Sequence, residues 1–433
     1  MSVHNSKEMY QCCTSLLIYR DVFDDRVGQA FLALLQALDS STSTLQAYST
    51  WFSALADRQL GWRDYLIKRI LSAENSFTRQ IKADQLPAPL LKAAEQDLRF
   101  LQQIYQCTSD EIAHWVSQCV ARPVVAWSDR LIESNPDRLR AREELRLRSQ
   151  LEASSDWAER LPDLIRFYRS FGVGLFADHD AFRWQNGHLV AIDHPDPVQI
   201  ETIVGYDAQR DTLIKNTEFL LAGLPALHIL LYGSRGSGKS SLVKSLLQRY
   251  RDRHLRLIEV GKSALNKLPL IVEQLRGLPQ KFVIFVDDLS FEEDDDAFKA
   301  LKVVLEGNLT ARPQNVVVYA TSNRRHLIRE YFDDRPRPKD ADEVHHWDTV
   351  QEKLSFSDRF GLTLTFEPAN QTTYLQIVRH LAQHAQITLS TEALEYQALQ
   401  WATRHNGRSG RTARQFVDFL KADRILAENT DQN

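Results

Sequence analysis

A glycine-rich segment between an apolar run and a helical pattern places the strongest constraint on how this chain can fold. Gly233, Gly236 and Gly238 alternate with small or polar residues and are followed by Lys239 and Ser240. Glycines at this spacing let the backbone curl so that several N–H groups point at one anion, and the following helix adds the positive end of its dipole. The pattern therefore predicts a strand, a phosphate-binding loop and a helix, in that order.

The side chains of this loop predict a site for a nucleoside triphosphate and its metal ion. Lys239 is placed to neutralise the β- and γ-phosphates, and the hydroxyl of Ser240 can ligate Mg²⁺. The residues expected to hold the nucleotide here are Gly233, Ser234, Arg235, Gly236, Ser237, Gly238, Lys239, Ser240 and Ser241.

Two adjacent carboxylates follow a second apolar run farther along the chain. The run Phe282–Val286 ends in Asp287 and Asp288. A phosphate loop needs a further metal ligand at the tip of a neighbouring strand, and Asp287 is the candidate, either directly or through water. Asp288 stands where a glutamate usually polarises the attacking water, but its side chain is one methylene shorter. Carboxylates at strand ends are also common in ordinary loops, so both assignments depend on the phosphate loop upstream.

The spacing of apolar residues divides the chain into a helical part and an α/β part. Up to about residue 175, apolar positions recur at helical intervals, as at Phe31, Leu34, Leu35 and Leu38. Beyond residue 200, short apolar runs alternate with helical segments. That alternation predicts a parallel sheet with helices on both faces.

These patterns predict four segments. Residues 1–178 form a mainly helical N-terminal domain, and 179–200 form a hairpin and linker, because Asn186–Gly187 is a strong two-residue turn signal. Residues 201–367 form an α/β nucleotide-binding domain with a five-stranded parallel sheet, and 368–433 form a helical lid.

Four longer strings resemble a known family: Asp287–Glu292, Leu305–Gly307, Ala320–Leu327 and Glu352–Leu362. Over residues ~200–430 the motifs, in this order, resemble those of AAA+ ATPases. More narrowly, the strings resemble the uncharacterised bacterial ATPase family known as domain of unknown function 815. The resemblance implies ATP binding and an AAA+ core, and it implies no substrate, because that family has no assigned process. The Asp-Asp pair departs from the Asp-Glu of the wider superfamily, which leaves the rate of turnover open.

The resemblance also implies roles for two residues outside the phosphate loop. Asn323 is expected to be sensor 1, a polar residue that orients the lytic water and lies between the strand before the phosphate loop and the strand Phe282–Val286. An asparagine that only caps its strand is the alternative interpretation. Arg359 precedes Phe360 and Gly361, and an arginine in this setting points out of its own subunit towards a neighbour's γ-phosphate. It is therefore expected to act as a finger in trans. A salt-bridged surface arginine is the alternative interpretation.

Two further contacts with the nucleotide follow from the same resemblance. Arg411 is our choice for sensor 2 at the start of a lid helix, with Arg408 and Arg414 as competitors. A solvated helix start with no contact to the nucleotide is the alternative interpretation. The segment expected to pack on adenine comprises Ile203, Val204, Gly205 and Tyr206.

Composition limits the classes of partner. The 53 basic and 57 acidic residues give a net charge of −4, so no global field favours nucleic acid or a membrane surface, although local basic patches stay open. The four cysteines form no zinc-type pair, which favours reduced thiols. No apolar run approaches the ~20 residues of a membrane span. We therefore expect a cytoplasmic protein.

Two functional hypotheses follow. The first is an AAA+ ATPase that forms a homo-oligomeric ring, for example a hexamer, and couples Mg²⁺-dependent ATP hydrolysis to remodelling of an unknown protein or nucleic-acid client. The second is an ATP-dependent switch or adaptor with little hydrolysis, which the shorter Asp288 favours. A P-loop kinase or small-molecule transferase fits poorly, because sensor and finger arginines have no place in it.

Overall fold

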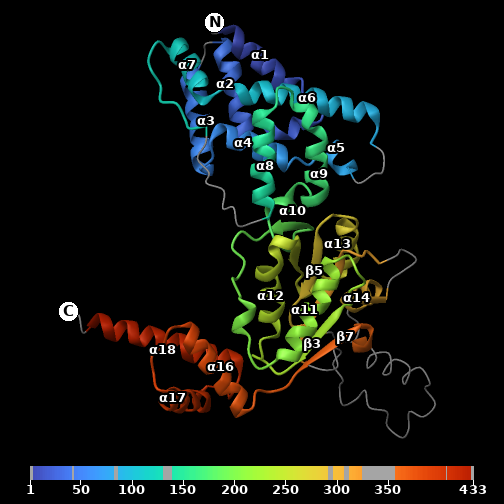
Figure 1. Ribbon diagram of the computed structural model, residues 1–433, viewed down its shortest axis with the longest axis vertical. Coiled ribbons are helices and arrows are strands. Elements are labelled where there is room, and N and C mark those ends of the chain that lie inside the picture. The colour runs from blue at the N-terminus through green and yellow to red at the C-terminus, as the bar shows by residue number, and fades with distance from the viewer. Residues whose placement is uncertain are drawn as a thin grey trace. The chain divides into compact units, whose positions relative to one another are not determined.

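The computed structural model describes residues 3–40, 43–81, 86–129, 139–290, 296–306, 312–323, 356–405 and 407–430. The chain divides into two compact units, Met1–Asp178 and His179–Asn433 (Figure 1). The four strings of the family resemblance lie partly outside the described residues. Every residue proposed for the nucleotide site lies inside them.

The first unit is built from helices (Figure 1). Its helices are α1 (Val3–Thr14), η1 (Tyr19–Phe23), α2 (Arg26–Ser40), α3 (Thr44–Arg58), α4 (Trp62–Leu71), α5 (Ser76–Gln80), α6 (Ala88–Gln106), α7 (Ser109–Val120), α8 (Leu139–Ala153), η2 (Trp157–Arg160), α9 (Leu161–Phe171) and α10 (Leu175–Asp178), where η marks a 3₁₀ helix.

The core of this unit contains the four apolar residues whose spacing predicted α2, and all four are buried. Large aromatic side chains fill this core, and Trp51, Trp62 and Trp157 are at most 1% exposed. Their burial contributes much of the hydrophobic stabilisation of the unit.

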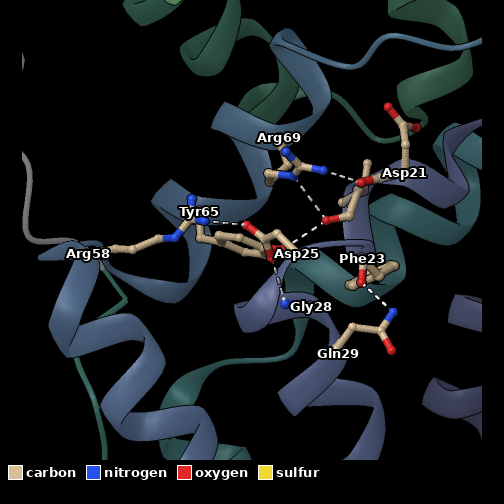
Figure 2. A network of polar contacts seen from close by, with 9 residues as sticks. Asp21, Phe23, Asp25, Gly28, Gln29, Arg58, Tyr65 and Arg69 are labelled. Atoms are coloured by element: carbon tan, nitrogen blue, oxygen red, sulfur yellow. Dashed lines mark hydrogen bonds and ion pairs between the residues drawn. The ribbon is translucent and has the colours of Figure 1, made fainter. Parts of the chain in front are cut away.

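A network of polar contacts inside the first unit ties η1 to α2, α3 and α4 (Figure 2). One oxygen of Asp25 accepts hydrogen bonds from the Tyr65 hydroxyl at 2.7 Å and from the Gly28 amide at 2.9 Å. The other oxygen pairs with Arg58 at 3.1 Å. Arg69 donates to the carbonyl oxygens at the start of this segment. Burial, followed by the Asp25 charge, raises the pKa of Tyr65, so its hydroxyl stays a donor.

The second unit is organised around one seven-stranded sheet. Its strands are β1 (Ala181–Gln185), β2 (His188–Ala191), β3 (Ile229–Gly233), β4 (Leu255–Glu259), β5 (Lys281–Val286), β6 (Val316–Ser322) and β7 (Leu362–Phe366). The order across the sheet is β2-β1-β4-β5-β6-β3-β7, and the five strands from β3 to β7 are all parallel. Strand β6 thus lies between β5 and β3, as the AAA+ resemblance implies, and the expected fold class is confirmed.

Helices cover the sheet and continue beyond it (Figure 1). They are η3 (Ile200–Thr202), α11 (Asp207–Leu221), α12 (Lys239–Tyr250), η4 (Arg251–Arg253), η5 (Lys262–Lys267), α13 (Leu268–Leu275), α14 (Asp296–Glu306), η7 (Phe356–Arg359), α16 (Gln371–His384), α17 (Thr391–Arg404) and α18 (Gly410–Thr430). Helices α11 and α12 share a core with the sheet. Strand β6 is buried at every position, so both of its faces are covered.

The hairpin differs from its prediction in where it pairs. Asn186 and Gly187 both have positive φ, 52° and 84°, as a two-residue hairpin turn requires. The prediction, however, treated residues 179–200 as a segment separate from the α/β domain, whereas β1 is part of its sheet. Strand β1 pairs in parallel with β4, and Arg183 binds Glu259 at 2.7 Å. The sheet therefore has seven strands and not five. The hairpin satisfies the edge of β4, whose backbone groups would otherwise be unpaired.

The last three helices have an apolar core of their own. Tyr374 and Val378 of α16 pack with Ala398 of α17 and Phe416 of α18. The Tyr374 hydroxyl donates to the Ala398 carbonyl at 3.0 Å, which links α16 to α17. In the part of the chain that the structure describes, no helix combines the length and the apolar character of a membrane span.

Candidate functional site

The glycine-rich loop is fixed to the sheet at one end and opens a helix at the other. Gly233 ends β3 with φ 137°, and a Cβ at this position would lie 2.0 Å from the carbonyl oxygen of Phe366. Only glycine fits there, and the Ser234 amide bonds to that same oxygen at 3.0 Å. Helix α12 begins at Lys239, so the amides of its first turn have no partner within the helix. These amides are free to bind an anion.

Lys239 places a buried cation at the base of this loop. The residue is 6% exposed, and its ammonium donates to the carbonyl oxygens of Gly233 at 3.0 Å and Ser234 at 2.7 Å. Burial lowers the pKa of Lys239, while the charges of Asp287 and Asp288 oppose that shift. In the described part of the chain no ion pair joins Lys239 to a carboxylate. Neutral oxygens hold the ammonium, so an incoming anion would meet a charge that is not yet neutralised.

Asp287, directly after β5, accepts hydrogen bonds from two hydroxyl groups. Its Oδ1 atom accepts from Ser240 at 2.6 Å and from Thr321 at 2.6 Å. Hydroxyl and carboxylate oxygens are the hard ligands that Mg²⁺ prefers. Because Ser240 donates its proton to Asp287, the lone pairs of its oxygen remain able to bind a cation. The donor set therefore fits a magnesium ion.

Asp288 lies beside Asn323 at the neighbouring strand end. The Asn323 side-chain amide donates to Asp288 Oδ1 at 2.6 Å, and the Asn323 oxygen lies 3.4 Å from the Lys239 ammonium. Asp288 has φ 52°, a left-handed conformation that is uncommon for residues other than glycine. The carboxylate, the amide and the ammonium thus form one continuous polar group.

A cavity of about 590 Å³ brings these groups together with the lid. Its polar lining includes the phosphate loop, both aspartates and Asn323, and its apolar lining comes from Ile203, Val204, Ile377 and Leu381. A cavity with convergent polar groups and an apolar side is typical of cofactor sites, and this volume suits a nucleotide. The amide of Arg411, in the first turn of α18, donates to the Gly236 carbonyl at 3.1 Å, so the lid is joined directly to the loop.

Comparison with known proteins decides the family. Residues 177–424 match the family described as "Protein of unknown function (DUF815)". The chain belongs to this family. No curated protein matches the sequence. Among solved structures, the RuvB Holliday junction branch migration motor of Thermotoga maritima is similar at 14% identity, over 54% of this chain and 67% of its own, with a TM-score of 0.38. A single-residue variant of that protein is similar at 14% identity, over 54% of this chain and 68% of its own, with a TM-score of 0.38.

Within this DUF815 protein, most of the residues expected to hold nucleotide line the cavity. They are Ile203, Val204, Arg235, Gly236, Ser237, Gly238, Lys239, Ser240, Ser241, Asp287, Asp288, Asn323 and Arg411. Gly233 and Ser234 are not among the lining residues. Their carbonyl oxygens hold Lys239 from behind instead.

Three other expected residues also lie outside the lining. The Tyr206 hydroxyl donates to the Glu367 carbonyl at 2.7 Å, and its ring packs on Phe366. A Cβ on Gly205 would lie 2.6 Å from the Thr373 side chain, so Gly205 allows α16 to approach. Arg359 forms an ion pair with Glu306 of α14. Tyr206 and Gly205 thus connect the segment before α11 to β7 and α16.

The sequence did not single out several residues that line the cavity. They are Thr202, Thr321, Ile377, Leu381 and Gly410. Thr321 stands two residues before Asn323, and alternate residues of a strand face the same side, so this spacing was the available signal. Ile377 and Leu381 have the spacing of a helix core face and gave no separate signal. Arg414, a competitor for sensor 2, lines the cavity together with Arg411.

Proposed function

We propose that the chain binds ATP with Mg²⁺ in this cavity and hydrolyses it as an AAA+ ATPase. The observation that carries the proposal is the buried ammonium of Lys239. Within the described residues, neutral oxygens hold this ammonium next to the first turn of α12 and to the hydrogen bond between Ser240 and Asp287. A triphosphate supplies the negative charge that this arrangement lacks.

Ser240 and Asp287 are the residues that would hold the metal. In the described residues no group of three His, Cys, Asp or Glu side chains is placed to bind a metal ion. Two protein oxygens are enough for Mg²⁺ when phosphate oxygens and water complete its shell. Bound there, the ion would neutralise charge on the β- and γ-phosphates. We therefore expect the metal to enter with the nucleotide.

The remaining side chains have roles that follow from their positions. Asp288 is our candidate for the base that receives a proton from the attacking water, and Asn323 orients that carboxylate through its 2.6 Å hydrogen bond. Arg411 and Arg414 line the cavity from α18 and would bind phosphate oxygens. Since Arg411 also bonds to the loop through its backbone, nucleotide exchange would move the lid.

Arg359 is our candidate for a contact made between subunits. It lies outside the cavity of its own chain, at the end of η7. A homo-oligomeric ring would bring it to a neighbour's γ-phosphate, where an arginine finger is worth about 10³–10⁵ in rate. The ring would couple hydrolysis to the remodelling of an unidentified protein or nucleic-acid client.

The test is the specific ATPase rate of purified protein across a range of protein concentrations, with Arg359→Ala as the variant. Catalysis in trans predicts a specific rate that rises with concentration and a loss of at least about 10³-fold in the variant. Arg253, exposed on η4, provides a matched control through Arg253→Ala, for which we expect the wild-type rate. A wild-type rate that is independent of dilution, together with full activity of Arg359→Ala, would contradict the proposal.

A second function, an ATP-dependent switch with little hydrolysis, is favoured by one observation. The Asp288 carboxylate is shorter than a glutamate and is already bound by Asn323. Asp288→Glu separates the two proposals. A switch predicts slow turnover in the wild type and faster turnover in Asp288→Glu. Rapid turnover by the purified wild type, with no partner added, would contradict the switch.

A further inference from the structure

The side chain of Thr321 forms hydrogen bonds with both Asp287 and Asp288. The residue is 1% exposed and lies near the end of β6, next to both strands that carry the phosphate-binding and metal-binding residues. Its hydroxyl lies 2.6 Å from Asp287 Oδ1 and 3.0 Å from the Asp288 amide nitrogen. One side chain therefore contacts both aspartates.

The chemistry of the partners fixes the direction of each hydrogen bond. The Asp288 amide can only donate, so it gives its proton to the Thr321 oxygen. The Thr321 hydroxyl has a single proton, and that proton points at Asp287 Oδ1. Ser240 donates to the same oxygen. Among the described residues, no hydrogen bond involves Asp287 Oδ2, so this oxygen is the one left for a cation or its water.

The backbone around Thr321 holds Asp288 in its left-handed conformation. The Leu289 amide donates to the Thr321 carbonyl at 2.7 Å, and the Ser322 hydroxyl donates to the Leu289 carbonyl at 2.8 Å. Both bonds fix Leu289, the residue that follows Asp288. Asp288 itself has a φ of 52°, which costs energy for a side chain of this kind. That conformation accompanies the 2.6 Å contact between the Asp288 carboxylate and Asn323.

We propose that Thr321 is a positioning residue, which acts on both aspartates through its hydroxyl group. It turns Asp287 so that Oδ2 faces the metal position, and it holds the Asp288 amide so that the carboxylate faces Asn323. This inference rests on the proposed ATPase function and adds a residue to that site. A purely structural role, satisfaction of a buried hydroxyl, would instead affect only the stability of the fold.

Thr321→Val removes the hydroxyl at nearly constant shape, and Thr321→Ser keeps it. Thr217 of α11 offers a matched control, because it is also buried under this sheet and bonds to Tyr319 at 3.0 Å, away from the cavity. For each variant we would measure the Mg²⁺ concentration that half-saturates ATP binding, ATP affinity in EDTA, kcat and the thermal unfolding temperature. Thr321→Ala is the second hydroxyl-free variant should Thr321→Val not fold.

The proposal predicts that Thr321→Val requires about 10- to 100-fold more Mg²⁺, as expected for loss of a hydrogen bond to a charged group, and has a lower kcat. ATP affinity in EDTA should change less than about 2-fold, and Thr321→Ser should recover both properties. Thr217→Val should lower the unfolding temperature only. Wild-type Mg²⁺ dependence in Thr321→Val, or equal loss in Thr217→Val, overturns the positioning role while nucleotide binding stands. Absence of Mg²⁺-dependent ATP binding in the wild type overturns both this proposal and the proposed function.

Discussion

Two aspartates, Asp25 in the helical unit and Asp287 in the α/β unit, have similar hydrogen bonds and different charge partners. Asp25 accepts from a tyrosine hydroxyl and a backbone amide, and Arg58 pairs with its second oxygen at 3.1 Å (Figure 2). Asp287 accepts from two hydroxyls, and within the described residues it has no ion pair. The charge of Asp25 is therefore balanced inside the protein, whereas that of Asp287 has no ion-pair partner among the described residues, as the proposed magnesium site requires.

The difference shows how a structural carboxylate can be told from a binding one. A carboxylate paired with an internal cation stabilises the fold, and its replacement leaves unsatisfied donors behind. A carboxylate that lines a cavity and lacks a counter-ion gains its partner only when ligand binds. Lys239 is a cation in the same situation, because its ammonium donates to neutral carbonyl oxygens and forms no ion pair within the described residues. Three predictions test the comparison, beginning with the largest effect.

Asp287→Asn should remove the metal-binding charge and leave the shape of the site unchanged. We expect ATPase activity to fall by at least about 10²-fold, because charge stabilisation by a metal contributes several kcal/mol to phosphoryl transfer. The unfolding temperature should change little, since Asp287 has no ion pair within the described residues and the asparagine oxygen can still accept from Ser240 and Thr321. Steady-state ATPase assays and thermal unfolding measure the two properties. A fall in stability with activity preserved would assign Asp287 to the same class as Asp25.

Asp25→Asn should have the opposite profile. It removes a charged acceptor from Tyr65, Gly28 and Arg58, so we expect a loss of about 1–3 kcal/mol in the free energy of unfolding. ATP affinity of the folded protein should stay within about 2-fold of wild type. Urea denaturation and calorimetric titration check these outcomes, with the exposed Asp57→Asn as a control of equal charge change. If Asp25→Asn lost ATP binding while its free energy of unfolding stayed unchanged, the assignment of Asp25 as a structural carboxylate would be wrong.

The smallest effect is a pH dependence that originates at Lys239. Burial lowers its pKa in the folded protein, whereas an unfolded lysine titrates near ~10.4. Between those two values the unfolded chain binds more protons, so the free energy of unfolding should rise with pH in that window. Lys239→Met should lack the rise, and ATP affinity of the wild type should fall across the same window. Denaturation curves at alkaline pH test this. An identical pH profile for both proteins would contradict it.

The sequence predicted those parts of the site that depend on residues close together in the chain. Lys239 and Ser240 follow from glycine spacing within one loop, and Asp287 from its place after an apolar run. Thr321 was not singled out, because a threonine at a strand end has many structural uses and only the pairing of β6 between β5 and β3 brings it to both aspartates. Its role depends on long-range strand order, which local patterns do not contain.

The same limit explains two further differences. Tyr206 was expected at the adenine, but in the structure its hydroxyl binds a carbonyl just after β7, a contact that spans most of the α/β unit in sequence. The turn at Asn186–Gly187 was predictable from two residues, whereas the pairing of β1 with β4 was not. Turn chemistry is local, and strand pairing is set by the whole fold.

The most direct test of the account is calorimetric titration of ATP into folded protein, with Mg²⁺ or with EDTA, for the wild type and Lys239→Ala. The account predicts Mg²⁺-dependent uptake of one ATP per chain and at least about 100-fold weaker binding by the variant, which is about 2.7 kcal/mol. Both proteins should unfold at similar temperatures. Failure of the folded wild type to take up ATP or ADP, or identical binding by Lys239→Ala, would contradict it.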